Sequence, residues 1–417
     1  MNKKNRRKSH SDRVKKRKFY GNQYINSKKE KKLTSELTEM ENLNDGNADK
    51  DAKELKRSTM ACCSIEMKPW GSVQGKKVKL FTLKNNNKQE VDVLNYGATI
   101  RAVRTLDKSG NVADVVLGFD DIDGYLGKDN PYFGATVGRV ANRISKGKFK
   151  VDGIEFTVSK NIGDNTLHGG FKGWNSKIWE STIRNDSLVM TLLSGDNEEG
   201  FPGDVIATTI FKFSDDGSLQ IEMKACSTKA TPINLTNHSY FNLAGHGTNS
   251  AELYKHSITM NADRWTVTDA ESIPTGEIRS VANSIMDLRS PTVFGDVIDK
   301  VPGGGYDYNF CLTEDNKFKS QNNKRLVAKV KHPESGRTLE VYSDQPGVQL
   351  YTSNFIPDRN ATGIAGKEGH TYFKHAAFCL ETQNYPDAIN HENFPDSILR
   401  PGDVYSHVVI YKFSYDK

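Results

Sequence analysis

The chain has 417 residues, of which 36% are hydrophobic and 26% charged, and its formal net charge is +6. This length allows one large domain or two ordinary ones, and the composition is typical of a globular protein with a polar tail. No run of eighteen apolar residues occurs and no apolar segment follows the basic N-terminus, so we expect neither a membrane-spanning helix nor a secretory signal peptide.

Residues 1–60 differ from the rest of the chain in charge. They hold 18 basic and 9 acidic residues, whereas the remaining 357 residues hold 40 basic and 43 acidic. Because this segment also lacks apolar periodicity, it cannot bury enough surface to offset its ordering entropy, and we expect a disordered basic extension. The rest of the chain is mildly acidic and gives no reason to expect nucleic-acid binding. Binding through the basic tail alone stays open, and its salt dependence would test it.

From about residue 65 onward, strand patterns alternate with short turns. Three hairpins are predicted within residues 147–160, 208–228 and 325–344, each with a glycine in its turn. Two further strands flank an Asn-rich turn within 76–100, and residues 403–416 alternate over one long strand. Helix is expected only for a turn or two at 121–126 and 387–394. We therefore expect residues 65–417 to form one all-β domain, a large antiparallel sandwich or barrel with a few short helices.

The five cysteines match no zinc-binding motif. Cys226, Cys311 and Cys379 lie in apolar, strand-like runs, which favours buried free thiols in a reducing compartment. We accordingly expect a cytoplasmic protein.

Four titratable residues stand out from the strand pattern. Glu381 follows the apolar run "AAFCL", and a carboxylate that ends a buried strand is costly unless it is paired or used. His238 lies in "NLTNHSYFNLAG", where a hydrogen-bonded core histidine and a functional one are about equally good explanations. His168 precedes two glycines in "LHGG", where a tight turn is by itself the better explanation, and Asp307, between two tyrosines in "YDYNF", is either a turn residue or a ligand-facing acid.

Several chemistries fit these residues poorly. The phosphate-binding loop, the Gly-x-Ser-x-Gly elbow and the zinc-protease helix are all absent. The sequence "HPE" at 332–334 resembles part of a metal triad, but its place on a hairpin turn explains it better. A metal held by the two histidines and two carboxylates is not favoured. Together with an arginine, amides and aromatic rings, these residues are typical of a sugar site, and an acid facing a base suggests reaction at the anomeric carbon.

Six motifs, in this order along the chain, resemble the galactose mutarotase (aldose 1-epimerase) family. They are "GRVANRISKG", "NTLHGG", "NLTNHSYFNLAG", "YDYNFCL", "PGVQLYTSN" and "ETQNYPDAINHENFP". The resemblance runs from about residue 65 to the C-terminus. It implies a large antiparallel β-sandwich, called a supersandwich, and an enzyme that interconverts the α and β anomers of free aldoses such as galactose and glucose without a cofactor or metal.

The resemblance also implies a role for each matching residue. Glu381 would be the general base, His238 the general acid, and His168 a second histidine that binds and polarises the sugar. The remaining matches are ligands of sugar hydroxyls, namely Asn142, Arg143, Asp307 and Gln349. Glu381 would take the proton of the C1 hydroxyl while His238 protonates the ring oxygen. Since carboxylates such as Asp307 favour a nearby cation, we expect His238 to be protonated near neutral pH.

Two alternatives use the same fold. A hexose 6-phosphate 1-epimerase would need a basic cluster, and near the motifs only Arg139, Arg143 and Lys146 offer one. A non-catalytic sugar-binding protein would lack the acid or the base, and both are present. The expected partner is a small sugar, with no membrane, and the expected assembly is a monomer or a weak dimer.

Overall fold

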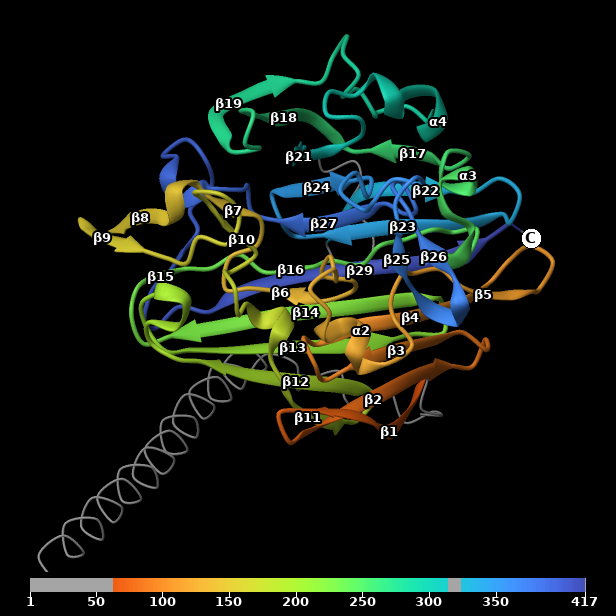
Figure 1. The fold of residues 1–417 in the computed structure, drawn as a ribbon, viewed down its shortest axis with the longest axis horizontal. Coiled ribbons are helices and arrows are strands. Elements are labelled where there is room, and N and C mark those ends of the chain that lie inside the picture. The colour runs from red at the N-terminus through yellow and green to blue at the C-terminus, as the bar shows by residue number, and fades with distance from the viewer. Residues whose placement is uncertain (1–62, 314–323, 417) are drawn as a thin grey trace, which may run out of the picture. The chain divides into compact units, whose positions relative to one another are not determined.

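Antiparallel strands dominate the described part of the protein, residues 63–313 and 324–416 of a computed structural model (Figure 1). The predicted all-β fold with short helices is confirmed. The extension predicted for residues 1–60 lies outside the described residues. No helix among the described residues is long and apolar enough to cross a membrane.

The largest sheet has nine antiparallel strands, and its long central strands run side by side through the molecule (Figure 1). In spatial order the strands are β11 (Glu180–Arg184), β12 (Ser187–Ser194), β13 (Val205–Phe213), β14 (Ser218–Ser227), β29 (Tyr405–Tyr415), β23 (Arg337–Ser343), β22 (Arg325–Lys331), β17 (Ser257–Met260) and β20 (Thr292–Val293). The C-terminal strand β29 joins β14 to β23, so it lies in the middle of the sheet.

Two five-stranded sheets accompany it. One has the order β1 (Cys63–Val73), β2 (Lys76–Asn85), β3 (Glu90–Leu94), β4 (Thr99–Leu106) and β5 (Val112–Asp114). The other has the order β19 (Pro274–Ser280), β18 (Ala262–Thr268), β21 (Asp307–Leu312), β24 (Gly347–Tyr351) and β27 (Cys379–Gln383). Neighbouring strands are antiparallel in both.

One hydrophobic core is shared by the three sheets. Alternate residues of the long strands, such as Ile221 in β14 and Val409 in β29, pack with Val93 from β3 and with Val348 and Leu380 from β24 and β27. Successive side chains of a strand point to opposite faces. The residues between these, Gln349 and Glu381 among them, therefore face away from the shared core.

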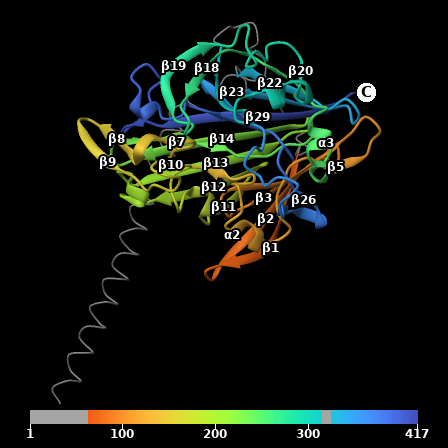
Figure 2. The ribbon, with the colours of Figure 1, turned by 45° about the horizontal axis from the view of Figure 1, so that its top comes forward.

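Short ladders and helices complete the described fold. The ladders are β6 (Thr136–Val137) with β16 (Thr236–Asn237), β7 (Arg143–Ile144) with β10 (Thr166–Leu167), β8 (Lys148–Val151) with β9 (Ile154–Thr157), β15 (Thr231–Pro232) with β28 (Ile398–Leu399), and β25 (Ile364–Ala365) with β26 (Thr371–Tyr372). The α-helices are α2 (Ile122–Leu126), α3 (Asn249–Leu253) and α4 (Phe294–Val297). The 3-10 turns are Ser145–Gly147, Trp174–Ser176, Glu198–Gly200, His246–Thr248, Ile298–Lys300, Lys367–Gly369 and Ala388–Asn390. Both views place β7, β8, β9 and β10 at one end of the long strands (Figure 2).

The local sequence patterns correctly located the hairpins. β8–β9, β13–β14 and β22–β23 are antiparallel pairs joined at the predicted turns, and β2–β3 flank the Asn-rich turn. Helix α2 occupies the segment predicted at 121–126, and Asp121 caps it by accepting a hydrogen bond from the Gly124 N–H. The segment predicted at 387–394 contains only the single 3-10 turn at 388–390.

Candidate active site

A cavity of about 410 Å³ lies beside the second five-stranded sheet, a volume within the range of roughly 300–1,000 Å³ that is usual for small-molecule sites. Segments far apart in the sequence line it. The lining residues that the sequence analysis had selected are Asn142, Arg143, His168, His238, Asp307 and Glu381. Of the seven candidates, Gln349 alone is not among the lining residues.

Three adjacent strands present the acidic part of the site. Glu381 in β27 pairs with Gln349 in β24, which in turn pairs with Asn309 in β21. The Gln349 side-chain amide donates a hydrogen bond of 2.7 Å to Oδ1 of Asp307, at the start of β21. Gln349 therefore orients the Asp307 carboxylate from beside the cavity.

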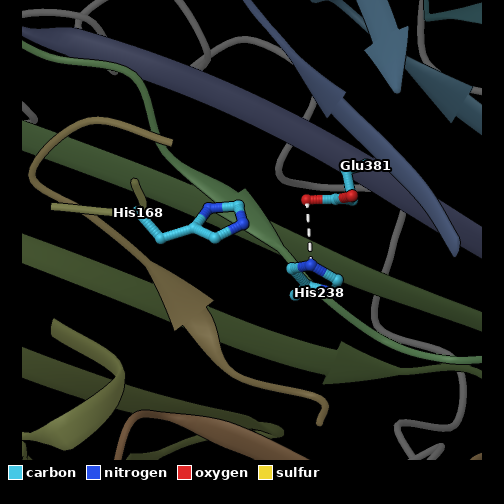
Figure 3. Close-up of side chains that lie close together, drawn as sticks. All are labelled: His168, His238 and Glu381. Carbon is cyan, nitrogen blue, oxygen red and sulfur yellow. Dashed lines mark ion pairs between the residues drawn. The ribbon is translucent and has the colours of Figure 1, made fainter. Parts of the chain in front are cut away.

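His238 follows directly after β16, and its backbone is held on both sides. Its N–H donates to the Ala135 carbonyl and its carbonyl accepts from the Gly134 N–H, both at 2.9 Å. The imidazole stacks on the Tyr240 ring, with 5.0 Å between centroids and an interplanar angle of 13°. These contacts leave the ring buried and aimed at Glu381, across a gap of 3.6 Å between Nε2 and Oε2 (Figure 3).

His168 lies on the other side of His238, with 5.2 Å between ring centroids (Figure 3). Its Nδ1 accepts a hydrogen bond of 3.1 Å from the Asn142 backbone N–H, and the backbone N–H of His168 donates to the Asn142 carbonyl. An imidazole nitrogen that accepts from an N–H carries no proton, so the neutral ring bears its proton on Nε2. His168 is thus prepared to donate a hydrogen bond.

The glycine after His168 has a steric reason. Gly169 has φ +85°, and a Cβ at this position would lie 2.1 Å from the Gly138 carbonyl oxygen. His168 and Asn142 themselves adopt left-handed conformations, with φ +50° and +61°. For a non-glycine residue such a conformation costs on the order of 1–3 kcal/mol.

Burial controls the protonation of His238 and Glu381, the central pair of the site. It lowers the pKa of His238 to about 4. Burial and the charge of Asp307 raise the pKa of Glu381 well above its usual value, against the opposing effect of Arg143. The expectation that nearby carboxylates would favour the His238 cation is therefore wrong, because loss of solvent outweighs charge attraction at a fully buried ring. Between the two pKa values the sugar-free pair holds one proton, on Glu381.

The remaining titratable groups follow the same principle. Burial and the neighbouring His238 and Arg143 lower the pKa of His168 well below its usual value, so that ring is neutral. Burial also raises the pKa of Asp307, whereas Arg143 and the hydrogen bond from Gln349 lower it. Arg143 is buried, lines the cavity, and its guanidinium donates no hydrogen bond to any residue within 63–313 or 324–416.

Ligand atoms of His168, His238 and Glu381 lie within 4.8 Å of one another, close enough to consider a metal ion. The set fits a metal poorly. Nδ1 of His168 is already an acceptor for the Asn142 N–H, so Nε2 keeps its proton and has no lone pair for a metal. A second group, Glu252, His332 and Glu334, contains part of the "HPE" turn, and Lys255 forms ion pairs with both of its carboxylates.

Several buried polar atoms of His238 and of strands β21, β24 and β27 have no hydrogen-bond partner within the described residues. They are Nδ1 of His238, Oε2 of Glu381, Oε1 of Gln349 and the whole side-chain amides of Asn309 and Gln383. Buried polar atoms are nearly always hydrogen-bonded in folded proteins. Of these residues His238 and Glu381 line the cavity, where a polyhydroxylated ligand offers both donors and acceptors.

Sequence reasoning missed the aromatic wall of the cavity. Tyr240 and Tyr351 come two residues after His238 and Gln349, so period-2 alternation within the motifs could have found them. Tyr132 and Phe355 also line the cavity, and no local pattern marks them, because tertiary packing brings them there. Phe355 is 72% exposed, and its ring stacks on that of Tyr351.

A family model described as "Aldose 1-epimerase" matches residues 79–412. The galactose mutarotase of Bos taurus is 45% identical over 337 residues, which cover 81% of this chain and 94% of that protein. The aldose 1-epimerase of Escherichia coli is 32% identical over 81% of this chain and 96% of that protein.

The chain belongs to the aldose 1-epimerase family. The solved structure of an aldose epimerase homologue from C. elegans superposes with a TM-score of 0.72 at 31% identity, covering 80% of this chain and 97% of that one. The predicted family and its β-sandwich fold are therefore confirmed. The roles of the individual site residues stay predictions.

Proposed function

We propose that the cavity binds a free hexose such as galactose or glucose, and that Glu381 and His238 interconvert its α and β anomers. As a member of the aldose 1-epimerase family, the chain is an enzyme. The observation that carries the catalytic assignment is the buried pair itself: a carboxylate and an imidazole 3.6 Å apart, in a cavity large enough for a sugar.

The reaction needs one proton to leave and one to arrive. Glu381 takes the proton of the C1 hydroxyl while His238 donates a proton to the ring oxygen, and the bond between C1 and the ring oxygen breaks. The aldehyde rotates about the C1–C2 bond, and the ring closes on the opposite face with the two roles reversed. Because each transfer accompanies the other, no free alkoxide or oxonium forms.

The proton count of the pair suits this cycle. The reactive arrangement, with Glu381 ionised and His238 protonated, contains the same single proton as the sugar-free pair. It differs only in which residue holds the proton. Sugar hydroxyls that donate to Glu381 favour its ionised form, as does the nearby Arg143. Sugar binding thus supports the transfer of the proton to His238.

The other residues hold the sugar. The Nε2–H of His168 is a hydrogen-bond donor to a sugar oxygen, and Arg143 and Asn142 are ligands for hydroxyl groups. Asp307, oriented by Gln349, accepts from another hydroxyl. The aromatic rings that line the cavity offer apolar faces to the C–H groups of the sugar ring. Fixing the substrate in this way keeps both proton transfers in reach.

The activity itself can be tested by polarimetry. We expect the protein to accelerate the change in optical rotation of freshly dissolved α-galactose and α-glucose, and to act much more slowly on glucose 6-phosphate. Arg143 is the one Lys or Arg among the residues that line the cavity in the described structure. Arg139 instead bonds the carbonyls of Pro202 and Gly203, and Lys146 is exposed outside the lining. Faster turnover of the phosphorylated sugar would favour the hexose-phosphate alternative.

The pH dependence of the catalysed rate follows from the shifted pKa values. As pH falls through about 4, His238 takes up a second proton for the pair and no base remains. As pH rises through the raised pKa of Glu381, the pair loses its only proton and no acid remains. We therefore expect kcat/KM, which reports the sugar-free enzyme, to fall on both sides: below about pH 5, and again as pH rises through the raised pKa of Glu381. Polarimetry corrected for the uncatalysed rate measures this profile, and an acidic decline centred near the ordinary histidine pKa would contradict it.

A cytoplasmic location is also part of this proposal. Within residues 63–313 and 324–416, Cys311 and Cys379 are buried thiols that form no disulfide, which suits a reducing compartment.

A further inference from the structure

Asp387 is a buried acid six residues beyond Glu381, where the chain leaves β27. The residue is 3% exposed, and its backbone has the left-handed φ of +55°. Its N–H donates a hydrogen bond of 3.1 Å to the Arg143 carbonyl, and its Oδ1 accepts one of 3.0 Å from the Ser145 N–H. Asp387 thus holds the backbone on both sides of Ile144.

The geometry of β7 explains why this contact matters. One edge of β7 pairs with β10, through Ile144 and Thr166. On the same edge, the Asn142 carbonyl accepts a hydrogen bond from the His168 backbone N–H. In an extended strand the carbonyl of one residue and the N–H two residues later point to the same edge. The Arg143 carbonyl and the Ser145 N–H therefore face away from β10, and Asp387 binds both, as a residue of a neighbouring strand would.

Asp387 is itself firmly anchored. Its Oδ1 also accepts from the Asn390 side chain at 2.7 Å, and its Oδ2 lies 3.5 Å from Nε2 of His391. That nitrogen is 3.1 Å from the carbonyl of Pro274, the first residue of β19. The turn before β19, residues 270–272, lines the cavity. Asp387 therefore contacts the segment after Glu381 and the Arg143 ladder directly, and it reaches the β18–β19 hairpin through His391.

We propose that Asp387 is a positioning residue that fixes the backbone of Arg143, so that the guanidinium meets the sugar hydroxyls. The proposal rests on the role of Arg143 as a sugar ligand. No described residue holds the guanidinium by a hydrogen bond or ion pair, so its place in the cavity depends on where the backbone carries it. Without the Asp387 carboxylate the Ser145 N–H would lose its acceptor, and the outer edge of this short strand would keep only the bond from the Asp387 N–H to the Arg143 carbonyl.

The test separates sugar binding from turnover. We expect Asp387→Ala to raise the KM for galactose about tenfold while kcat changes less than about threefold, because the acid and base stay in place. Asp387→Asn keeps an oxygen acceptor for the Ser145 N–H, so its KM should stay close to that of the parent protein. The matched control is Asp396→Ala, which removes a carboxylate whose one hydrogen bond to a described residue comes from the Ile398 N–H, within its own turn. Equal effects of Ala and Asn at position 387 would overturn the proposal.

Two further measurements locate the cause of a failure. Arg143→Met should raise KM by itself, and adding Asp387→Ala should then cost little more, since coupled residues are non-additive. An unchanged KM in Arg143→Met would refute the assignment of Arg143 as a ligand. If Arg143→Met raised KM but Asp387→Ala left KM at the parent value, only the positioning role of Asp387 would be refuted. Hydrogen exchange on the parent protein works even if Asp387→Ala does not fold. The Ser145 amide should be protected, and exchange as fast as in an exposed loop would overturn the proposal.

Discussion

Glu381→Gln is expected to reduce kcat for galactose by about 10²–10⁴-fold, with KM changed by no more than about threefold. The amide is nearly isosteric with the carboxyl group and still hydrogen-bonds, but it cannot accept and return a proton. Binding by His168, Arg143 and Asp307 should persist. Polarimetry at several galactose concentrations gives kcat and KM separately.

A second His–Glu pair supplies the control for this variant. Nε2 of His246 lies 3.6 Å from Oε2 of Glu368, the same separation as in the proposed catalytic pair, yet Glu368 is exposed and lies outside the cavity. Glu368→Gln should therefore leave both kinetic constants unchanged. A parent-like kcat in Glu381→Gln would show that another group is the base.

His238→Asn is expected to cause a loss of kcat of similar size, about 10²–10⁴-fold, with sugar binding retained. Asparagine can place an N–H near the ring oxygen but cannot transfer its proton. Since the two residues act in one concerted exchange, the double variant Glu381→Gln/His238→Asn should be hardly slower than either single variant. Polarimetry measures all three.

Two comparisons guard the interpretation of this variant. His246→Asn removes a buried histidine that hydrogen-bonds Tyr372, so it controls for loss of packing without touching the cavity. Thermal unfolding of both variants shows whether the fold is intact. If the rate losses of Glu381→Gln and His238→Asn multiplied in the double variant, the two residues would be acting independently, contrary to the proposed exchange.

Local pattern was enough to find the three hairpins, the β2–β3 pair and the strand β29, and the hairpin turning at Asp152–Gly153 illustrates why. A period-2 alternation and a glycine turn depend only on neighbours in the chain. The same reasoning could not give the order of strands in a sheet. Nothing local indicates that β29, the last strand, lies between β14 and β23. That order arises from long-range burial of one face of each strand.

The candidate site residues were found from short motifs, and Glu381 and Asp307 show what such motifs cannot reveal. Glu381 had a local signal, because it is a charged residue directly after an apolar run. The hydrogen bond from Gln349 to Asp307 had none, because it joins different strands. Asp387 was overlooked for the same reason. In the sequence it belongs to a motif and a short helical turn, and only the folded chain brings it to Arg143.

By itself the sequence determined the strand pattern, the family and the identity of the candidate acid and base, since all of these are carried by local spacing and short motifs. Only the tertiary structure decided how those groups ionise. The sequence suggested a cationic His238 beside carboxylates, whereas the fold buries the ring and lowers its pKa to about 4. The reason is physical: the energy of a charge depends on the solvent it loses and on the groups that surround it in space.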